Sequence, residues 1–325
     1  MKLNNTRIEV MQTIGKSMDE FLVKFLKPIE ENWQPSDFLP DPTNPNFHEE
    51  VAELQELARE MSYDLFVTLI GDTVTEEALP SYESWLMDVE GIDNVNRNGW
   101  SQWVRSWTAE ENRHGDLLNK YLYLSGRVNM REFETTVQYL ISDGFDIGTG
   151  RDPYRNFIYT SFQELATNIS HRRVATQCKK TGNSKIAKMC GMIAADEMRH
   201  ANAYIHFAQR IFDIDPSEMM MALEDMMRKK IVMPAGFLRE SGDQIGDLFD
   251  VFSDAAQRAA IYTTQDYIDI LSSLLTQWDV ANIRGLNEKG EKARDYVMAL
   301  PGRLQRISSR IKIPETVHQF KWVAY

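Results

Sequence analysis

The sequence of 325 residues is poor in the residues that interrupt helices or cross-link chains. It has only 17 glycines and 11 prolines, which favours helices over an all-β or loop-rich structure. Its two cysteines, Cys178 and Cys190, exclude a disulfide framework and indicate a reducing compartment. No apolar run approaches the roughly 18 residues of a membrane span, so we expect no membrane partner.

Positive charge is also in deficit. Lysine and arginine number 36 against 48 aspartates and glutamates, which gives a net charge of −12 at pH 7. Binding to nucleic acid needs a basic surface, so we expect no nucleic-acid partner. The composition, 43% hydrophobic and 26% charged, is that of an average globular protein and excludes disorder as the dominant state.

Helical periodicity runs through most of the chain and predicts an all-α fold. Apolar residues recur at helical spacing over 49–83, 100–124, 129–141, 154–180, 184–212, 216–231 and 254–278. No repeated short alternating segment indicates strands, and no linker divides the chain. We therefore predict a single domain over 1–325. Its parts are an N-terminal extension (about 1–48), a core helical bundle (about 49–280) and a C-terminal tail (about 281–325).

Two of the predicted helices carry the same short motif, acid–Glu–x–Arg–His, at 110–114 and 196–200. Its glutamate and histidine are three residues apart and lie on one helix face, within the apolar stripe that faces the core. The two pairs are Glu111 with His114 and Glu197 with His200. A carboxylate in a core is costly unless it is paired or binds a metal. The repeat therefore predicts a metal site.

The remaining histidines do not belong to this repeated motif. A third Glu-x-x-His, Glu315 to His318, lies in the tail without an apolar stripe, and we interpret it as structural. His48, His171 and His206 have no partner pattern, and we interpret them as structural or surface residues.

A ferritin-like site for two metal ions also needs one lone glutamate from each of two further helices. Glu164 lies 33 residues before Glu197, and Glu76 lies 35 residues before Glu111, although Glu77 fits the same stripe. Four carboxylates and two imidazoles, without a thiolate, suit two iron ions. The spacing thus predicts a ferritin-like helical bundle with a di-iron core.

The acids that precede the paired glutamates are candidates for orienting the histidines. Each can accept a hydrogen bond from the free ring N–H of the histidine on the opposite helix. We expect Asp196 to orient His114 and Glu110 to orient His200.

Longer blocks of the sequence resemble the soluble acyl-acyl carrier protein desaturases. The blocks are residues 33–42, 75–80, 107–128, 157–164, 194–200 and 225–231. The resemblance implies a ferritin-like fold with extra flanking helices and two carboxylate-bridged iron ions, with dioxygen as co-substrate. It implies the iron ligands Glu76, Glu111, His114, Glu164, Glu197 and His200, and so favours Glu76 over Glu77.

The same resemblance implies a reaction and its partners. The reaction is insertion of a cis double bond, most commonly at position nine, into a saturated chain on acyl carrier protein. Ferredoxin is the implied electron donor, and a homodimer is the implied assembly. Thr167 is implied in oxygen activation, and Trp33, with Asp196 and His114, in an electron route to the irons. A ferritin-like di-iron ferroxidase or another di-iron oxidase remains the alternative.

The substrate cleft and the docking surface are less clearly marked. Trp85 and Ile147 fall where the family builds its cleft and look bulkier than in plant relatives, which predicts shorter chains unless they pack elsewhere. The densest basic cluster, Arg228, Lys229 and Lys230, is the candidate for docking the acidic carrier protein. The start at Met1, without a transit-like leader, favours a bacterial cytoplasmic protein over a mature plastid stromal one.

Overall fold

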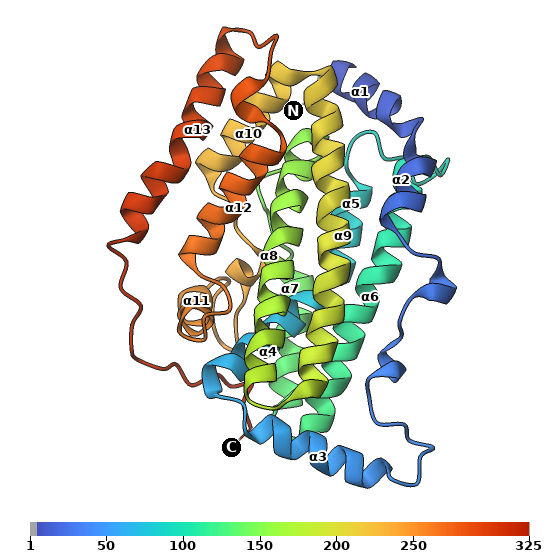
Figure 1. The fold of residues 1–325 in the computed structure, drawn as a ribbon, viewed down its shortest axis with the longest axis vertical. Coiled ribbons are helices and arrows are strands. Elements are labelled where there is room, and N and C mark those ends of the chain that lie inside the picture. The colour runs from blue at the N-terminus through green and yellow to red at the C-terminus, as the bar shows by residue number, and fades with distance from the viewer. Residues whose placement is uncertain (1–4, 325) are drawn as a thin grey trace.

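The computed structural model describes residues 5–324, which form 13 α-helices and four short 3-10 segments (Figure 1). Within this range there is no strand, and one isolated bridge joins Val128 to Val323. The all-α prediction is confirmed. No helix of the described range has the length and apolar composition needed to cross a membrane.

Four helices form the centre of the molecule. They are α4 (Tyr63–Glu77), α6 (Gly99–Ser125), α8 (Pro153–Lys180) and α9 (Ser184–Ile214). Helices α8 and α9 make a long hairpin along the vertical axis of the view, with α6 beside α9 (Figure 1). Helix α8 is buried on most of its faces, as expected for a helix surrounded by others.

The ends of these helices follow from local sequence. Asn98 caps α6 by accepting a hydrogen bond from the backbone N–H of Ser101, and Gly126 ends it in the left-handed conformation, with φ of 63°. Asp152 caps α8 in the same way, before a proline at the first helical position. The predicted break before α9 is also present, because Gly182 has φ of 85° and Asn183 caps the next helix.

Nine further helices surround this centre. They are α1 (Asn5–Gly15), α2 (Met18–Phe25), α3 (Phe47–Arg59), α5 (Leu79–Met87), α7 (Met130–Asp143), α10 (Pro216–Lys229), α11 (Phe249–Arg258), α12 (Thr264–Gln277) and α13 (Glu288–Ser308). The predicted C-terminal tail contains helix α13, which has 21 residues and packs on α10 and α12 (Figure 1). Its buried residues Gly290, Ala293 and Val297 provide the small apolar stripe for that packing.

An aromatic layer closes one part of the core between α6, α8 and α9. Trp100 stacks on Phe157 with ring centroids 5.2 Å apart, and Trp103 meets Phe207 edge-to-face at 5.0 Å. Such pairs contribute about 0.5–1.5 kcal/mol each beyond the area they bury.

Candidate metal centre

The four central helices bring the six predicted ligands together. They are Glu76 of α4, Glu111 and His114 of α6, Glu164 of α8, and Glu197 and His200 of α9. They form two overlapping groups whose ligand atoms lie within 4.8 Å of one another. Glu111 and Glu197 belong to both groups, so they can bridge two ions.

We call the group that contains His114 and Glu76 the α6 position, and the group that contains His200 and Glu164 the α9 position. Their geometry repeats. Nδ1 of His114 lies 3.0 Å from Oε1 of Glu197, and Nδ1 of His200 lies 2.6 Å from Oε1 of Glu111. In each position the lone glutamate presents its Oε2 atom 3.8 Å from the histidine Nδ1.

Several of these buried atoms lack a hydrogen bond. Although the distances above are short, Nδ1 of His114, Nδ1 of His200 and Oε1 of Glu111 make no hydrogen bond of acceptable geometry within the described part of the chain. A buried polar group without a partner costs about 1–3 kcal/mol. A cation at each position would coordinate these atoms, and imidazole with carboxylate is a donor set suited to iron or manganese. The residues therefore fit two metal ions.

The charge balance of the cluster also favours cations. Burial raises the pKa of Glu164 well above its usual range, and neighbouring carboxylates, Glu111 first, raise it further. Burial lowers the pKa of His114, but the carboxylates around it outweigh burial and raise that pKa well above its usual range. Burial raises the pKa of Glu76, but the nearby imidazoles of His114 and His171 outweigh burial and lower that pKa to about 2. The site thus stabilises positive charge.

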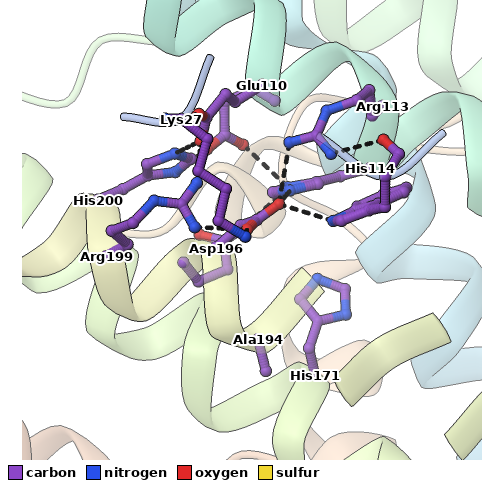
Figure 2. Close-up of polar contacts among 12 residues, drawn as sticks. Lys27, Glu110, Arg113, His114, His171, Ala194, Asp196, Arg199 and His200 are labelled. Carbon is purple, nitrogen blue, oxygen red and sulfur yellow. Dashed lines mark hydrogen bonds and ion pairs between the residues drawn. The ribbon is translucent and has the colours of Figure 1, made fainter. Parts of the chain in front are cut away.

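Asp196 lies close to His114 (Figure 2). It faces Nε2 of the ring, whereas Nδ1 faces the other ligands. Its Oδ2 atom is 3.6 Å from Nε2 of His114 and accepts hydrogen bonds of 2.9 Å from Trp33 Nε1 and from Arg113 Nη2. Arg199 donates to the other oxygen at 2.7 Å. Burial raises the pKa of Asp196, but His114 and Arg199 outweigh it and lower that pKa. The carboxylate is therefore ionised and faces the ring.

Glu110 lies behind His200 in the corresponding place (Figure 2). Its Oε2 atom is 2.9 Å from Nε2 of His200, and its Oε1 atom accepts a hydrogen bond of 2.9 Å from the backbone N–H of Lys27. Arg199 contacts Glu110 as well as Asp196, so one guanidinium joins both acids. The structure thus brings together both pairs that the motif predicts.

Trp33 and Thr167 also lie beside the cluster. The Trp33 indole is buried and parallel to the His114 ring, with an interplanar angle of 10° and centroids 5.9 Å apart. The Thr167 hydroxyl donates to Oε2 of Glu197 at 2.7 Å. Their places agree with the implied electron route and oxygen activation, and these roles remain predictions.

A small cavity adjoins the cluster. Its volume of about 20 Å³ is enough for one water-sized molecule. It is lined by Thr75, Glu76, Leu79, Tyr82, Trp107, Glu111, Gln163, Thr167 and Glu197. Trp85 and Ile147 are not part of this lining: Trp85 donates to Thr149 at 3.2 Å, and Ile147 is buried elsewhere in the core. Their place in a substrate cleft stays a prediction.

The basic candidates for docking are exposed but partly neutralised. Arg228 pairs with Glu224 at 2.6 Å, and Lys229 pairs with Asp225 at 2.9 Å. Lys230 follows the end of α10 with φ of 66° and has no ion-pair partner among residues 5–324. The docking role of these three residues is likewise a prediction.

Two neighbours of the lone glutamates were missed by the sequence analysis. His171, interpreted as structural or surface, is buried, with Nε2 2.8 Å from Oε1 of Glu76. Trp107 donates its indole N–H to Oε1 of Glu164 at 3.2 Å. The sequence carried a usable signal for both residues, namely that each lies on the same helix face as a predicted ligand. His171 follows Glu164 by two helical turns, and Trp107 precedes Glu111 by one.

The other sequence-based interpretations can be placed as well. Glu77 is directed towards Gly115 and Asn119, outside the two ligand groups. His48 is exposed and His206 is half-buried against Phe21. The third Glu-x-x-His copy lies in a non-helical segment, so its spacing does not place both side chains on one helix face.

Comparisons with known proteins point to one family. The sequence model of the fatty acid desaturase family matches residues 6–324. The chain is 50% identical to a chloroplastic stearoyl-[acyl-carrier-protein] 9-desaturase of Ricinus communis, over 94% of this chain and 77% of the relative. It is 48% identical to the Spinacia oleracea enzyme of that name, with the same coverage. The solved structure of DesA2 from Mycobacterium tuberculosis H37Rv covers 89% of this chain, and 99% of DesA2 is matched. Its TM-score of 0.49 at 17% identity is too low to support a conclusion.

Proposed function

This chain belongs to the fatty acid desaturase family, and we propose that it is an acyl-acyl carrier protein desaturase. Such an enzyme removes two hydrogens from a saturated acyl chain, leaving a cis double bond. With two further electrons and two protons, one dioxygen becomes two waters. The observation that carries the proposal is the convergence of six ligand residues, five buried and Glu76 half-buried, in a chain 50% identical to a stearoyl-carrier protein desaturase.

Two iron ions are the proposed cofactors. Glu76 and His114 would hold one ion at the α6 position, and Glu164 and His200 would hold the other at the α9 position, with Glu111 and Glu197 shared. When bound, the ions would supply the redox chemistry for dioxygen activation.

The surrounding residues prepare the ligands. By accepting a hydrogen bond from Nε2–H, Glu110 selects the tautomer of His200 whose Nδ1 lone pair faces the cluster. Asp196 faces Nε2 of His114 and favours the same tautomer there. The Thr167 hydroxyl holds a proton at the edge of the cavity, within hydrogen-bond distance of Glu197.

Finer assignments are part of the proposal. The names of the relatives support a stearoyl chain and position nine. We propose ferredoxin as electron donor, with Trp33 on its route, and a homodimer as the assembly. Arg228, Lys229 and Lys230 are proposed to dock the carrier protein. The relatives are chloroplastic, and the plastid stroma stands beside the bacterial cytoplasm as a proposed location.

A turnover assay tests the reaction. Iron-loaded protein would receive stearoyl- or palmitoyl-carrier protein, dioxygen, ferredoxin and its reductase, and mass spectrometry would identify the product. We expect a monounsaturated chain that is lost in Glu111→Ala. Oxygen consumption without an unsaturated product would instead support the ferroxidase alternative.

A further inference from the structure

A second buried polar cluster lies behind the lone glutamate of the α6 position. His171 of α8 is only 1% exposed, and its Nε2 atom is 2.8 Å from Oε1 of Glu76. The Cys190 thiol of α9 interacts with the same ring. Next to His171, the Ser170 hydroxyl donates to Asp72 of α4 at 2.7 Å. The buried imidazole thus lies among α4, α8 and α9, and its hydrogen-bond contact is to Glu76 of α4.

The hydrogen bond has a defined direction. A carboxylate that ligates a cation is ionised, so Glu76 in the proposed metal centre can only accept a hydrogen bond. Nε2 of His171 must then carry the proton and donate it to Oε1. With Oε1 occupied, Oε2 is the oxygen that faces His114, 3.8 Å from Nδ1. The contact thus leaves Oε2 as the Glu76 oxygen that would face an ion at the α6 position.

The α9 position uses the same arrangement with a different donor. Oε1 of Glu164 accepts a hydrogen bond of 3.2 Å from Trp107, and Oε2 is directed towards His200 at 3.8 Å. An indole N–H is a fixed donor, whereas an imidazole N–H depends on tautomer, so the two positions are chemically different. The two positions thus have the same types of metal ligand but different hydrogen-bond donors to their lone glutamates.

We propose that His171 is a positioning residue that holds Glu76 in the orientation required at the α6 position. It acts through Glu76 and does not touch the ion. The inference rests on the proposed metal centre but not on the acyl substrate. Removal of such outer partners lowers metal affinity about 10–100-fold in other proteins, and we expect a loss of that size at the α6 position alone.

Cobalt binding without dioxygen or substrate tests this inference. Apo-protein would be titrated with Co²⁺ while the visible absorption and the bound metal per chain are measured. We expect two ions in the wild type. In His171→Leu we expect one site unchanged and one weakened at least about 10-fold. His171→Gln, whose amide N–H can reach Glu76, should bind within about three-fold of the wild type, and His171→Asn, whose amide is too short, should resemble the leucine variant.

Two further variants make the result specific. Trp107→Phe should weaken the other site, with a different change in the absorption spectrum. His206→Leu removes a half-buried histidine away from the cluster and should leave both sites unchanged. Circular dichroism and thermal unfolding report whether each variant is folded. If the leucine variant does not fold, the difference in cobalt affinity between the glutamine and asparagine variants tests the proposal.

Three results would overturn the proposal or its basis. Wild-type affinity at both sites in a folded leucine or asparagine variant overturns it, as does equal weakness of the glutamine and asparagine variants. A wild-type chain that binds fewer than two cobalt ions overturns the metal centre itself. A chain that binds two ions but makes no unsaturated product overturns only the proposed reaction and supports the inference about His171 if the variants behave as expected.

Discussion

The two metal positions have matching ligands but different surroundings. At the α9 position, Glu110 lies 2.9 Å from Nε2 of His200 and is held by the backbone N–H of Lys27. At the α6 position, Asp196 lies farther from its histidine, at 3.6 Å, and also receives the Trp33 indole. A separation of 3.6 Å is too long for a direct hydrogen bond. His114 at the α6 position is thus held less closely by its orienting acid than His200 is. Of the two orienting acids, Asp196 is the one that accepts a hydrogen bond from an indole.

This difference shows that the metal ligands and the residues around them meet different requirements. Ligand positions must repeat, because both ions need the same hard oxygen and imidazole donors. The outer partners can differ, because they determine how tightly each ion is held and how electrons and oxygen reach it. Arg199 contacts both acids and links the two positions through one side chain. Variants that affect one position at a time can test this division.

The largest expected effect comes from the shared ligands. Glu111→Ala removes an oxygen from both ligand groups, and we expect fewer than one tightly bound metal per chain and no measurable turnover. Glu164→Ala removes an oxygen from the α9 group only, so one ion should remain. Metal analysis after gel filtration checks both. Equal metal content in the two variants would contradict the assignment of shared and lone ligands.

Much of this arrangement could be predicted from the sequence, for physical reasons. The Glu-x-x-His spacing reports one helix face directly, and Glu110 and Asp196 immediately precede the paired glutamates. Contacts between distant segments left weaker signals. His171 reaches Glu76 across 95 residues, and a lone histidine carries no periodic pattern. The choice between Glu76 and Glu77 depends on how α4 meets α6, which no local spacing specifies.

That meeting of helices provides the next prediction. A Cβ at Gly115 would lie 3.2 Å from the carbonyl carbon and oxygen of Glu76 and 2.9 Å from the Glu77 side chain. The backbone of Glu76 cannot rotate away from a new methyl group as a flexible side chain can. We therefore expect Gly115→Ala to push α4 away from α6 and to displace Glu76. We expect a loss of about 1–3 kcal/mol in unfolding free energy and weakened metal binding at the α6 position.

Gly191→Ala is the matched control for this substitution. Gly191 lies inside α9, and a Cβ there would meet nothing within 4 Å. Alanine should raise the free energy of unfolding by about 0.5–1 kcal/mol, because glycine is a poor helix former. Thermal unfolding and cobalt titration of both variants give the comparison. An unchanged Gly115→Ala would show that the close approach of α4 and α6 is unimportant, whereas a destabilised Gly191→Ala would mean that the control position does not tolerate alanine.

The acids behind the histidines should give a smaller, unequal effect. Glu110→Ala removes the direct hydrogen bond to His200, and we expect metal affinity at the α9 position to fall about 10–100-fold. Asp196→Ala acts across 3.6 Å, so its effect on the α6 position should be smaller. It should cost more stability, since Arg113 and Arg199 lose a buried partner. Metal titration and chemical denaturation separate the two quantities. The reverse order of affinities would mean that the two distances do not reflect orienting strength.

The smallest expected effect concerns electron delivery and touches only the α6 position. Trp33→Phe keeps a ring beside His114 but removes the Nε1–H donated to Asp196. Metal content should stay unchanged, because none of the six ligands is altered. Stopped-flow reduction by ferredoxin should slow several-fold, whereas reduction by dithionite, a small donor that need not use the indole, should change less. Equal rates with both donors in the variant and the wild type would remove Trp33 from the route and leave it as a packing partner of His114.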